Sequence, residues 1–154
     1  LVKIIEKSKK KNFLSKINPS TKTFQALRIF VNKEISELIN GITYATKFLR
    51  PGGRLIVISF HSIEDKIIKY YFSNFSKNRS NPSRYLPEDG ENKFFLFESY
   101  NKKVFKPSRN EIIKNKPSRS AKLRFAIRSK KGFSYPSNLF QKFEKYLNIE
   151  AKNV

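Results

Sequence analysis

The sequence predicts an α/β fold, and three observations point to it. Apolar residues recur at steps of three and four between Thr23 and Leu49, which is the spacing of an amphipathic helix. Residues 54–60 then form a short, β-branched apolar run, typical of a strand buried on both faces of a parallel sheet. Residues 120–128 alternate polar and apolar side chains, as does a strand with one solvated or charged face.

The chain before the first strand is expected to be helical. Residues 1–16 are interpreted as the end of a basic helix. A turn at residues 18–21 follows, and Ser20 or Thr21 is expected to cap the long helix. We expect this helix to be continuous, with any bend near Gly41.

The predicted strand lies between two helices. Residues 50–53, Arg-Pro-Gly-Gly, end the first helix and turn the chain. A second helix is expected to begin near Ser62, and Ser62 with Asp65 has the spacing of a capping box. Residues 76–93 show no periodicity and are rich in turn formers, which predicts a flexible loop.

The remaining elements are shorter. Residues 94–97 and 103–105 have the composition of strand segments around a bend. Residues 108–115 are expected to form a short helix, and residues 139–147 an amphipathic one. One strand of the buried parallel type is too few to cover and complete an α/β sheet, so the pattern indicates missing sequence.

Composition restricts the chemistry. The chain has 154 residues, no cysteine and one histidine, which excludes disulfides, thiolate sites and multi-histidine metal sites, and we expect no metal. Lys and Arg number 33 against 12 acidic residues, a net charge of +21 that favours a polyanionic partner such as nucleic acid, or an anionic membrane surface. Compositional bias toward lysine is the alternative. No methionine is present although the chain begins at Leu1, so we expect a processed chain or a piece of a longer one.

The densest chemistry follows the apolar strand. The candidate cleft residues are an imidazole, two hydroxyls, two carboxylates and an aromatic ring: Ser59, Phe60, His61, Ser62, Glu64 and Asp65. Ligands of open α/β sheets bind at the carboxyl ends of the strands, and free helix N–H groups attract anions there. The alternative is that these residues only cap the helix. Gly52-Gly53 is interpreted as a turn, because no glycine-rich phosphate or cofactor loop is present.

Two basic segments are candidates for RNA contact. One is the strand entry at residues 117–124, where cations stand beside hydroxyls suited to phosphate. The other opens the long helix. The named candidates are Arg28, Arg119, Ser120, Lys122 and Arg124. A solvated basic edge and a plain capped helix are the respective alternatives.

Three stretches together carry a family resemblance: residues 21–32 (TKTFQALRIFVN), 49–65 (LRPGGRLIVISFHSIED) and 119–124 (RSAKLR). In their order and spacing they resemble the bacterial and organellar methyltransferases that modify N4 of a cytidine in small-subunit ribosomal RNA. The resemblance covers residues 17–130 and only the carboxyl-terminal part of the family.

The resemblance implies the second half of a Rossmann-like class I methyltransferase domain. Residues 1–18 are then the end of a helical insertion and a linker, residues 19–130 the half-domain, and residues 131–154 a basic tail with a short amphipathic helix. It implies S-adenosylmethionine as cofactor, small-subunit ribosomal RNA or the assembled subunit as partner, and a cytoplasmic protein without a membrane partner.

The chain also departs from the family. The glycine-rich loop, the acidic residue that holds the cofactor ribose and the Asp-Leu-Gly-Val-Ser-Ser stretch all precede the matched segments, and none is found here. We therefore assign no cofactor-binding residue to this chain and expect it to be inactive alone. The alternatives are a non-catalytic basic RNA-binding module and an inert truncated product.

Overall fold

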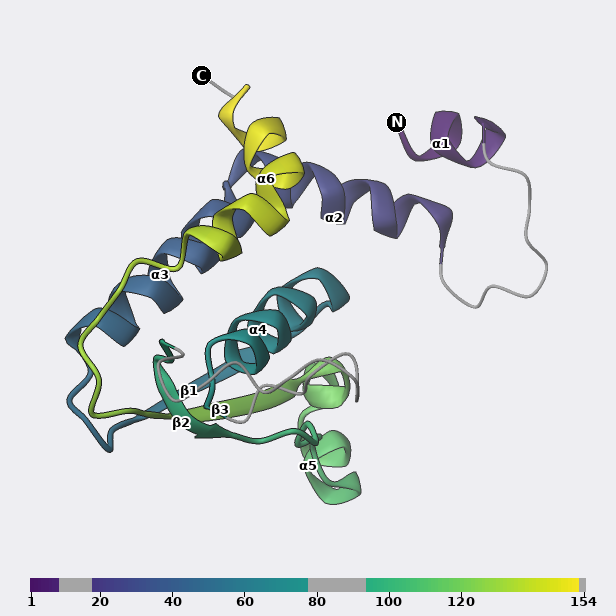
Figure 1. The fold of residues 1–154 in the computed structure, drawn as a ribbon. Coiled ribbons are helices and arrows are strands. Elements are labelled where there is room, and N and C mark those ends of the chain that lie inside the picture. The colour runs from purple at the N-terminus through teal and green to yellow at the C-terminus, as the bar shows by residue number, and fades with distance from the viewer. Residues whose placement is uncertain (9–17, 78–93, 153–154) are drawn as a thin grey trace, which may run out of the picture. The chain divides into compact units, whose positions relative to one another are not determined.

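The computed structural model describes residues 1–8, 18–77 and 94–152 (Figure 1). They form two compact units, one comprising Leu1–Glu37 with Glu144–Val154 and the other Leu38–Phe143. The predicted loop over residues 76–93 lies almost wholly outside the described residues, as does the end of the predicted first helix. No helix in the described ranges is long and apolar enough to span a membrane.

The first unit is helical. It contains α1 (Val2–Ser8), α2 (Pro19–Val31), the start of α3 (Glu34–Phe48) and the end of α6 (Ser137–Ala151). Asn18 caps α2, because its side-chain oxygen accepts a hydrogen bond from the Ser20 N–H at 2.8 Å. The predicted cap at Ser20 or Thr21 is therefore wrong. Pro19 takes the first helical position, where its missing N–H costs nothing, and the cap precedes it.

The long helix predicted from Thr23 to Leu49 is two helices. α2 ends at Val31 and α3 begins at Glu34, and Lys33 between them has a left-handed φ of 51°. The Asn32 N–H donates to the carbonyls of Arg28 and Phe30, which closes the last turn of α2. The predicted bend near Gly41 is wrong, since Gly41 lies inside α3.

A carboxylate from the far end of the chain caps α3. Glu150, in the last turns of α6, accepts hydrogen bonds from the N–H groups of Ile35 at 3.0 Å and Ser36 at 2.8 Å. Glu150 is 2% exposed. Its negative charge lies at the positive end of the helix dipole, which is the favourable arrangement.

The second unit is built on a three-stranded antiparallel sheet in the order β1-β3-β2. The strands are β1 (Arg54–Ser59), β2 (Phe97–Tyr100) and β3 (Lys122–Arg128). β2 thus begins where one predicted strand segment ends, and Phe105 of the other forms an isolated bridge with Leu123. Helix α4 (Ser62–Asn74) packs on one face of this sheet (Figure 1).

The sequence predicted that the first strand is buried on both faces, and this prediction is wrong. Ile56 and Ile58 are 57% and 54% exposed, whereas Ser59 is buried. β1 pairs with β3 in antiparallel fashion, with Ile56 opposite Phe125 and Ile58 opposite Leu123. One face of β1 is therefore open among the described residues.

The polar face of β3 is buried, although the sequence predicted that it is solvated or charged. The predicted solvated face carries Arg124 and Arg128, but these residues are 6% and 5% exposed and lie on the face that α4 covers. The apolar Leu123, Phe125 and Ile127 alternate with them and are only half-buried. The alternation is correct, but the inward side carries the arginines.

Aromatic rings fill the space between α4 and the sheet. Tyr71 and Phe72 of α4 are fully buried, and each meets the ring of Phe97 edge-on. The Tyr71 hydroxyl donates to Oγ1 of Thr46 at 2.9 Å. Burial raises the pKa of Tyr71 to about 12, although the Thr46 hydrogen bond and the charge of Arg128 oppose the shift.

The connections and short helices agree with the predictions from the sequence. Gly52, with φ of 80°, permits the turn that residues 50–53 were predicted to make. Helix α5 (Arg109–Lys114) is capped by Ser108, which confirms the predicted short helix. A 3₁₀ turn, η1 (Lys116–Ser120), leads into β3. The predicted amphipathic patch lies within α6, where Leu139 and Phe143 are buried.

Candidate functional site

The candidate cleft residues lie where β1 ends and α4 begins. Ser59, the last residue of β1, is buried, and its Oγ lies 3.4 Å from the carbonyl oxygen of Lys122, to which it donates. The next side chain, Phe60, is 57% exposed. Ser62 is exposed in the first turn of α4. The turn thus presents a ring and a hydroxyl to the surroundings.

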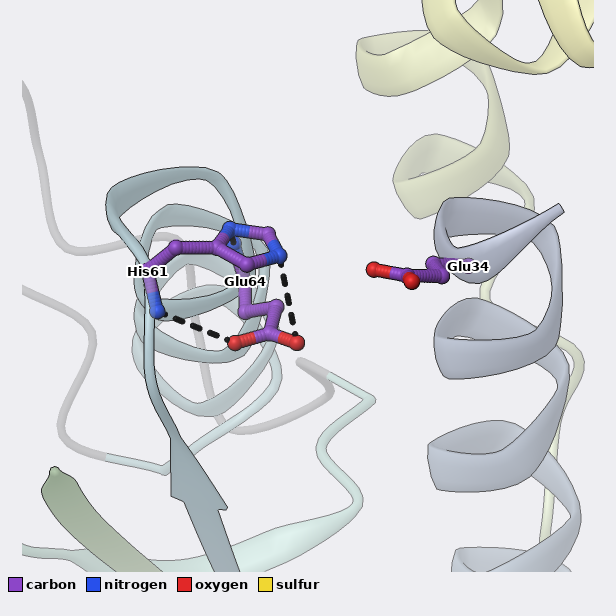
Figure 2. Close-up of side chains that lie close together, drawn as sticks. All are labelled: Glu34, His61 and Glu64. Atoms are coloured by element: carbon purple, nitrogen blue, oxygen red, sulfur yellow. Dashed lines mark hydrogen bonds and ion pairs between the residues drawn. The ribbon is translucent and has the colours of Figure 1, made fainter. Parts of the chain in front are cut away.

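His61 and Glu64 hold this turn in a reciprocal capping box (Figure 2). The Glu64 N–H donates to Nδ1 of His61 at 3.3 Å. The Glu64 carboxylate accepts from the N–H groups of Phe60 at 2.8 Å and His61 at 3.1 Å. The predicted Ser62–Asp65 box is therefore wrong by one residue. The error arises because histidine is not among the preferred N-cap residues.

The capping box indicates which nitrogen of a neutral His61 ring carries the proton. Nδ1 must be unprotonated to accept the Glu64 N–H, so the neutral ring carries its proton on Nε2. Nε2 lies 3.2 Å from Oε1 of Glu64. Nδ1 thus accepts a hydrogen bond from Glu64, and Nε2 lies within ion-pair distance of the same residue's carboxylate. Glu34, also drawn in Figure 2, belongs to the other compact unit, where its carboxylate pairs with Arg28 at 2.7 Å.

Asp65 joins α4 to β3 through two cations. Its carboxylate accepts from Arg124 Nε at 2.7 Å and from Lys122 Nζ at 3.0 Å. Burial acts to raise the pKa of Asp65, but the hydrogen bonds and charges of Arg124 and Lys122 outweigh it and lower the pKa. Two predicted RNA contacts are therefore engaged in an intramolecular ion pair. Arg124 is nearly inaccessible at its side chain, 7% exposed, whereas Lys122 retains 33%.

The other predicted RNA contacts are placed differently. Arg119 and Ser120 are exposed at the end of η1, directly before β3. Arg28 belongs to the first unit, with 57% of its side chain exposed. The structure brings Lys122 and Arg124 together with the cleft residues, and Arg119 and Ser120 precede them along the chain.

One feature near this edge was missed from the sequence. A cavity of about 140 Å³ lies on the open face of the sheet, lined by Ile58, Leu123, Phe105 and four further residues. Phe105 is stacked on Phe125, with ring centroids 6.2 Å apart. The alternation of polar and apolar residues in β3 could have indicated this cavity. That would have required assigning the apolar residues to the face away from α4.

Comparison with known proteins identifies the family. The family model described as "MraW methylase family" matches residues 1–135. The chain belongs to the MraW methylase family. Proteins named "Ribosomal RNA small subunit methyltransferase H" are similar to it. The one from Agrobacterium fabrum is 43% identical over 129 residues, which is 84% of this chain and 36% of that protein.

Two further proteins of the same name are similar to this chain. The Xanthobacter autotrophicus protein is 47% identical over 113 residues, 73% of this chain and 32% of its own length. The Ehrlichia canis protein is 45% identical over 112 residues, 73% of this chain and 35% of its own length. The resemblance to ribosomal RNA methyltransferases is confirmed. The chain spans about a third of the length of these MraW-family relatives.

Methyltransferases use S-adenosylmethionine, and the described residues at this edge fit it poorly. The glycine pair, Gly52-Gly53, is in the turn at the opposite end of β1. Of the two carboxylates at the edge, Glu64 caps α4 and Asp65 pairs with two cations. Neither carboxylate is available to a cofactor ribose without breaking those contacts. We therefore derive no step through the cofactor from this chain.

Proposed function

We propose that this chain forms the substrate side of an S-adenosylmethionine-dependent methyltransferase that modifies N4 of a cytidine in small-subunit ribosomal RNA. The family match over residues 1–135 carries the proposal. The ordered turn at residues 59–65, at the carboxyl end of β1, supports it. The methyl donor is held by the part of the enzyme that has no counterpart in this chain.

An exocyclic amine demands precise positioning. Its lone pair is delocalised into the cytosine ring, so the amine is a weak nucleophile and must be aligned with the methyl donor. The base must leave its stack to reach the active site. In the proposed arrangement the exposed ring of Phe60 stacks on the extruded base, and the exposed hydroxyl of Ser62 accepts a hydrogen bond from an N4 hydrogen.

In this proposal His61 positions the turn and does not remove the proton. Its Nδ1 is engaged by the Glu64 N–H, and its Nε2 carries the remaining proton next to the Glu64 carboxylate. A ring in that state has no accessible lone pair for a base. The amine becomes acidic only after methylation, so its proton can leave late, to water.

The open face of the sheet supports a second part of the proposal. Within the described residues β1 pairs on one side only, and its exposed face continues into that of β3. The apolar residues of this face are Ile56, Ile58, Phe105, Leu123, Phe125 and Ile127. An α/β sheet requires cover on both faces. We propose that the remaining two thirds of a family polypeptide covers this face and pairs with the free edge of β1, whether on the same chain or a separate one.

The test is a methyl-transfer assay on small ribosomal subunits that lack N4-methylcytidine. The chain is assayed alone and after addition of the portion of the Ehrlichia canis relative that has no counterpart here. Nucleosides are then analysed by mass spectrometry. We expect N4-methylcytidine only in the combined reaction. Methylation at another atom would contradict the substrate assignment, and no methylation in the combined reaction would contradict the proposed activity.

A non-catalytic RNA-binding module is the second candidate function. The engagement of both carboxylates at the candidate site favours it for the chain by itself. Under this function the chain alone binds small-subunit RNA with the affinity it has in the combined reaction, and the added portion contributes no methylation.

A further inference from the structure

At the end of the sheet away from His61, lysine side chains lie close to an aromatic ring. A cavity of about 480 Å³ lies there, where β3 ends and β1 begins. Its lining includes Phe95, Glu98, Lys130 and Lys131. Among the described lining residues Glu98 is the one acidic side chain, and it pairs with Lys77 at 3.1 Å. The local charge is therefore positive.

The backbone behind this surface is firmly held. The Arg128 guanidinium donates to the carbonyl oxygens of Leu96 at 2.8 Å and Thr46 at 3.2 Å. The Ser129 N–H donates to the same Leu96 carbonyl at 2.9 Å, and its hydroxyl to the Phe95 carbonyl at 3.0 Å. The segments that carry Phe95 and Lys130–Lys131 are thus fixed to one another.

The cations lie against the ring. Lys131 Nζ is 4.5 Å from the centroid of Phe95, and Lys77 Nζ is 6.0 Å from it. The neighbouring Lys130 is exposed. At the carboxyl end of β1, two of the predicted RNA-contact cations, Lys122 and Arg124, are held by Asp65. The end of the sheet opposite the candidate site therefore combines an aromatic ring with two lysines at cation–π distance.

We propose that this surface, Phe95 with Lys130 and Lys131, is a second RNA-binding site that holds a single-stranded segment of the substrate. A base stacks on Phe95 and displaces the ammonium of Lys131, which then pairs with a phosphate together with Lys130. The exchange is favourable because base stacking on an aromatic ring exceeds an exposed cation–π contact. The inference rests on the proposed function only in taking RNA as the ligand.

The test measures binding of the full chain to a fluorescently labelled single-stranded RNA by anisotropy at several salt concentrations. We expect Lys130→Ala with Lys131→Ala to weaken binding about tenfold. The slope of log affinity against log salt should fall by about 0.7 for each lost phosphate contact. The matched control is Lys66→Ala with Lys69→Ala, which removes two exposed cations from α4. Equal effects of the two double variants would overturn the proposal.

The aromatic contribution is tested separately. Phe95→Leu should weaken binding several-fold with an unchanged salt slope, and Phe95→Tyr should restore it. Phe48→Leu, at a 76% exposed ring that also lies beside a lysine ammonium, is the control and should have no effect. Loss of affinity in Arg119→Ala but not in Lys130→Ala with Lys131→Ala would refute this second site and leave the proposed methyltransferase function intact. The reverse result, without methyl transfer in the combined reaction, would retain the site and refute that function.

Discussion

The two faces of the sheet have opposite composition and opposite surroundings. The face under α4 holds Arg124 and Arg128, both nearly buried, whereas the open face carries Phe125 and Ile127 of the same strand together with the exposed Ile58. Each buried arginine donates hydrogen bonds. Arg124 donates to the Asp65 carboxylate, and Arg128 donates to backbone carbonyls. The difference teaches that available partners, rather than residue type alone, determine which face a helix covers.

The largest expected effect is on the covered face. Arg128→Ala removes the guanidinium that donates to the buried Thr46 and Leu96 carbonyls, of which the Leu96 carbonyl keeps the Ser129 N–H as a donor. We expect the free energy of unfolding to fall by about 3 kcal/mol, measured by urea denaturation. Arg54→Ala, at an exposed position of β1, is the control and should change it by less than about 0.5 kcal/mol. Similar losses in both variants would contradict the contrast between the faces.

Asp65→Asn should have the next largest effect. The substitution keeps the size of the side chain but removes the charge that binds Arg124 and Lys122. We expect a loss of about 2 kcal/mol at neutral pH, since hydrogen bonds to charged groups contribute that much. Glu98→Gln breaks a pair whose side chains are half-exposed and should cost little.

The stabilisation by Asp65 should also depend on pH. The two cations lower the folded-state pKa of Asp65 below the ordinary value of 3.8, against the effect of burial. A lowered pKa stabilises the fold at pH values above the ordinary pKa, and the contribution is lost as the pH falls through the lower one. The stability difference between the unsubstituted chain and Asp65→Asn should therefore be constant near neutrality and shrink below pH 3.8. A constant difference down to pH 2 would be inconsistent with the ion pair.

The open face is tested by Ile58→Lys. The side chain is 54% exposed, so the chain alone should lose less than about 0.5 kcal/mol. Its affinity for the remaining portion of the Ehrlichia canis relative should fall at least tenfold, about 1.4 kcal/mol, by calorimetry. Ile113→Lys, at a 67% exposed position of α5, makes the same change elsewhere. Equal binding of the two variants would exclude the open face as the docking surface.

The smallest effect is expected at His61. Asparagine is a preferred N-cap residue, so His61→Asn should change stability by less than about 0.5 kcal/mol, whereas His61→Ala should cost about 1 kcal/mol. In the combined methyl-transfer reaction His61→Asn should retain much of the activity. General-base catalysis contributes about 10²–10⁴-fold. A loss of that size in His61→Asn, with an unchanged melting temperature, would make His61 the base.

Much of the local structure could be predicted from the sequence. Glycine at positions 52 and 53, Ser108 before α5 and the apolar spacing in α6 each specify an element through local chemistry alone. The position of the candidate site at the end of β1 followed from the same patterns. These patterns depend only on residues close together in the sequence, so they can be interpreted without knowing how the elements pack.

The errors have longer-range causes. The break at Asn32–Lys33 contains neither glycine nor proline, and its geometry depends on side-chain and backbone hydrogen bonds. The inward arginines of β3 could not be foreseen, because Asp65 and the Leu96 carbonyl come from other elements. The exposure of Ile56 and Ile58 could not be predicted either, because an apolar β-branched run has the same sequence pattern whether or not another segment covers it.

The Glu150 cap has a consequence for truncation of the chain. The family match ends at residue 135 and α6 begins at Ser137, so the carboxylate that caps α3 lies outside the matched region. Cutting the chain at residue 135 would keep every matched residue and still remove the acceptor for the N–H groups of Ile35 and Ser36. The boundary of the family match is therefore not the boundary of the hydrogen-bonded structure.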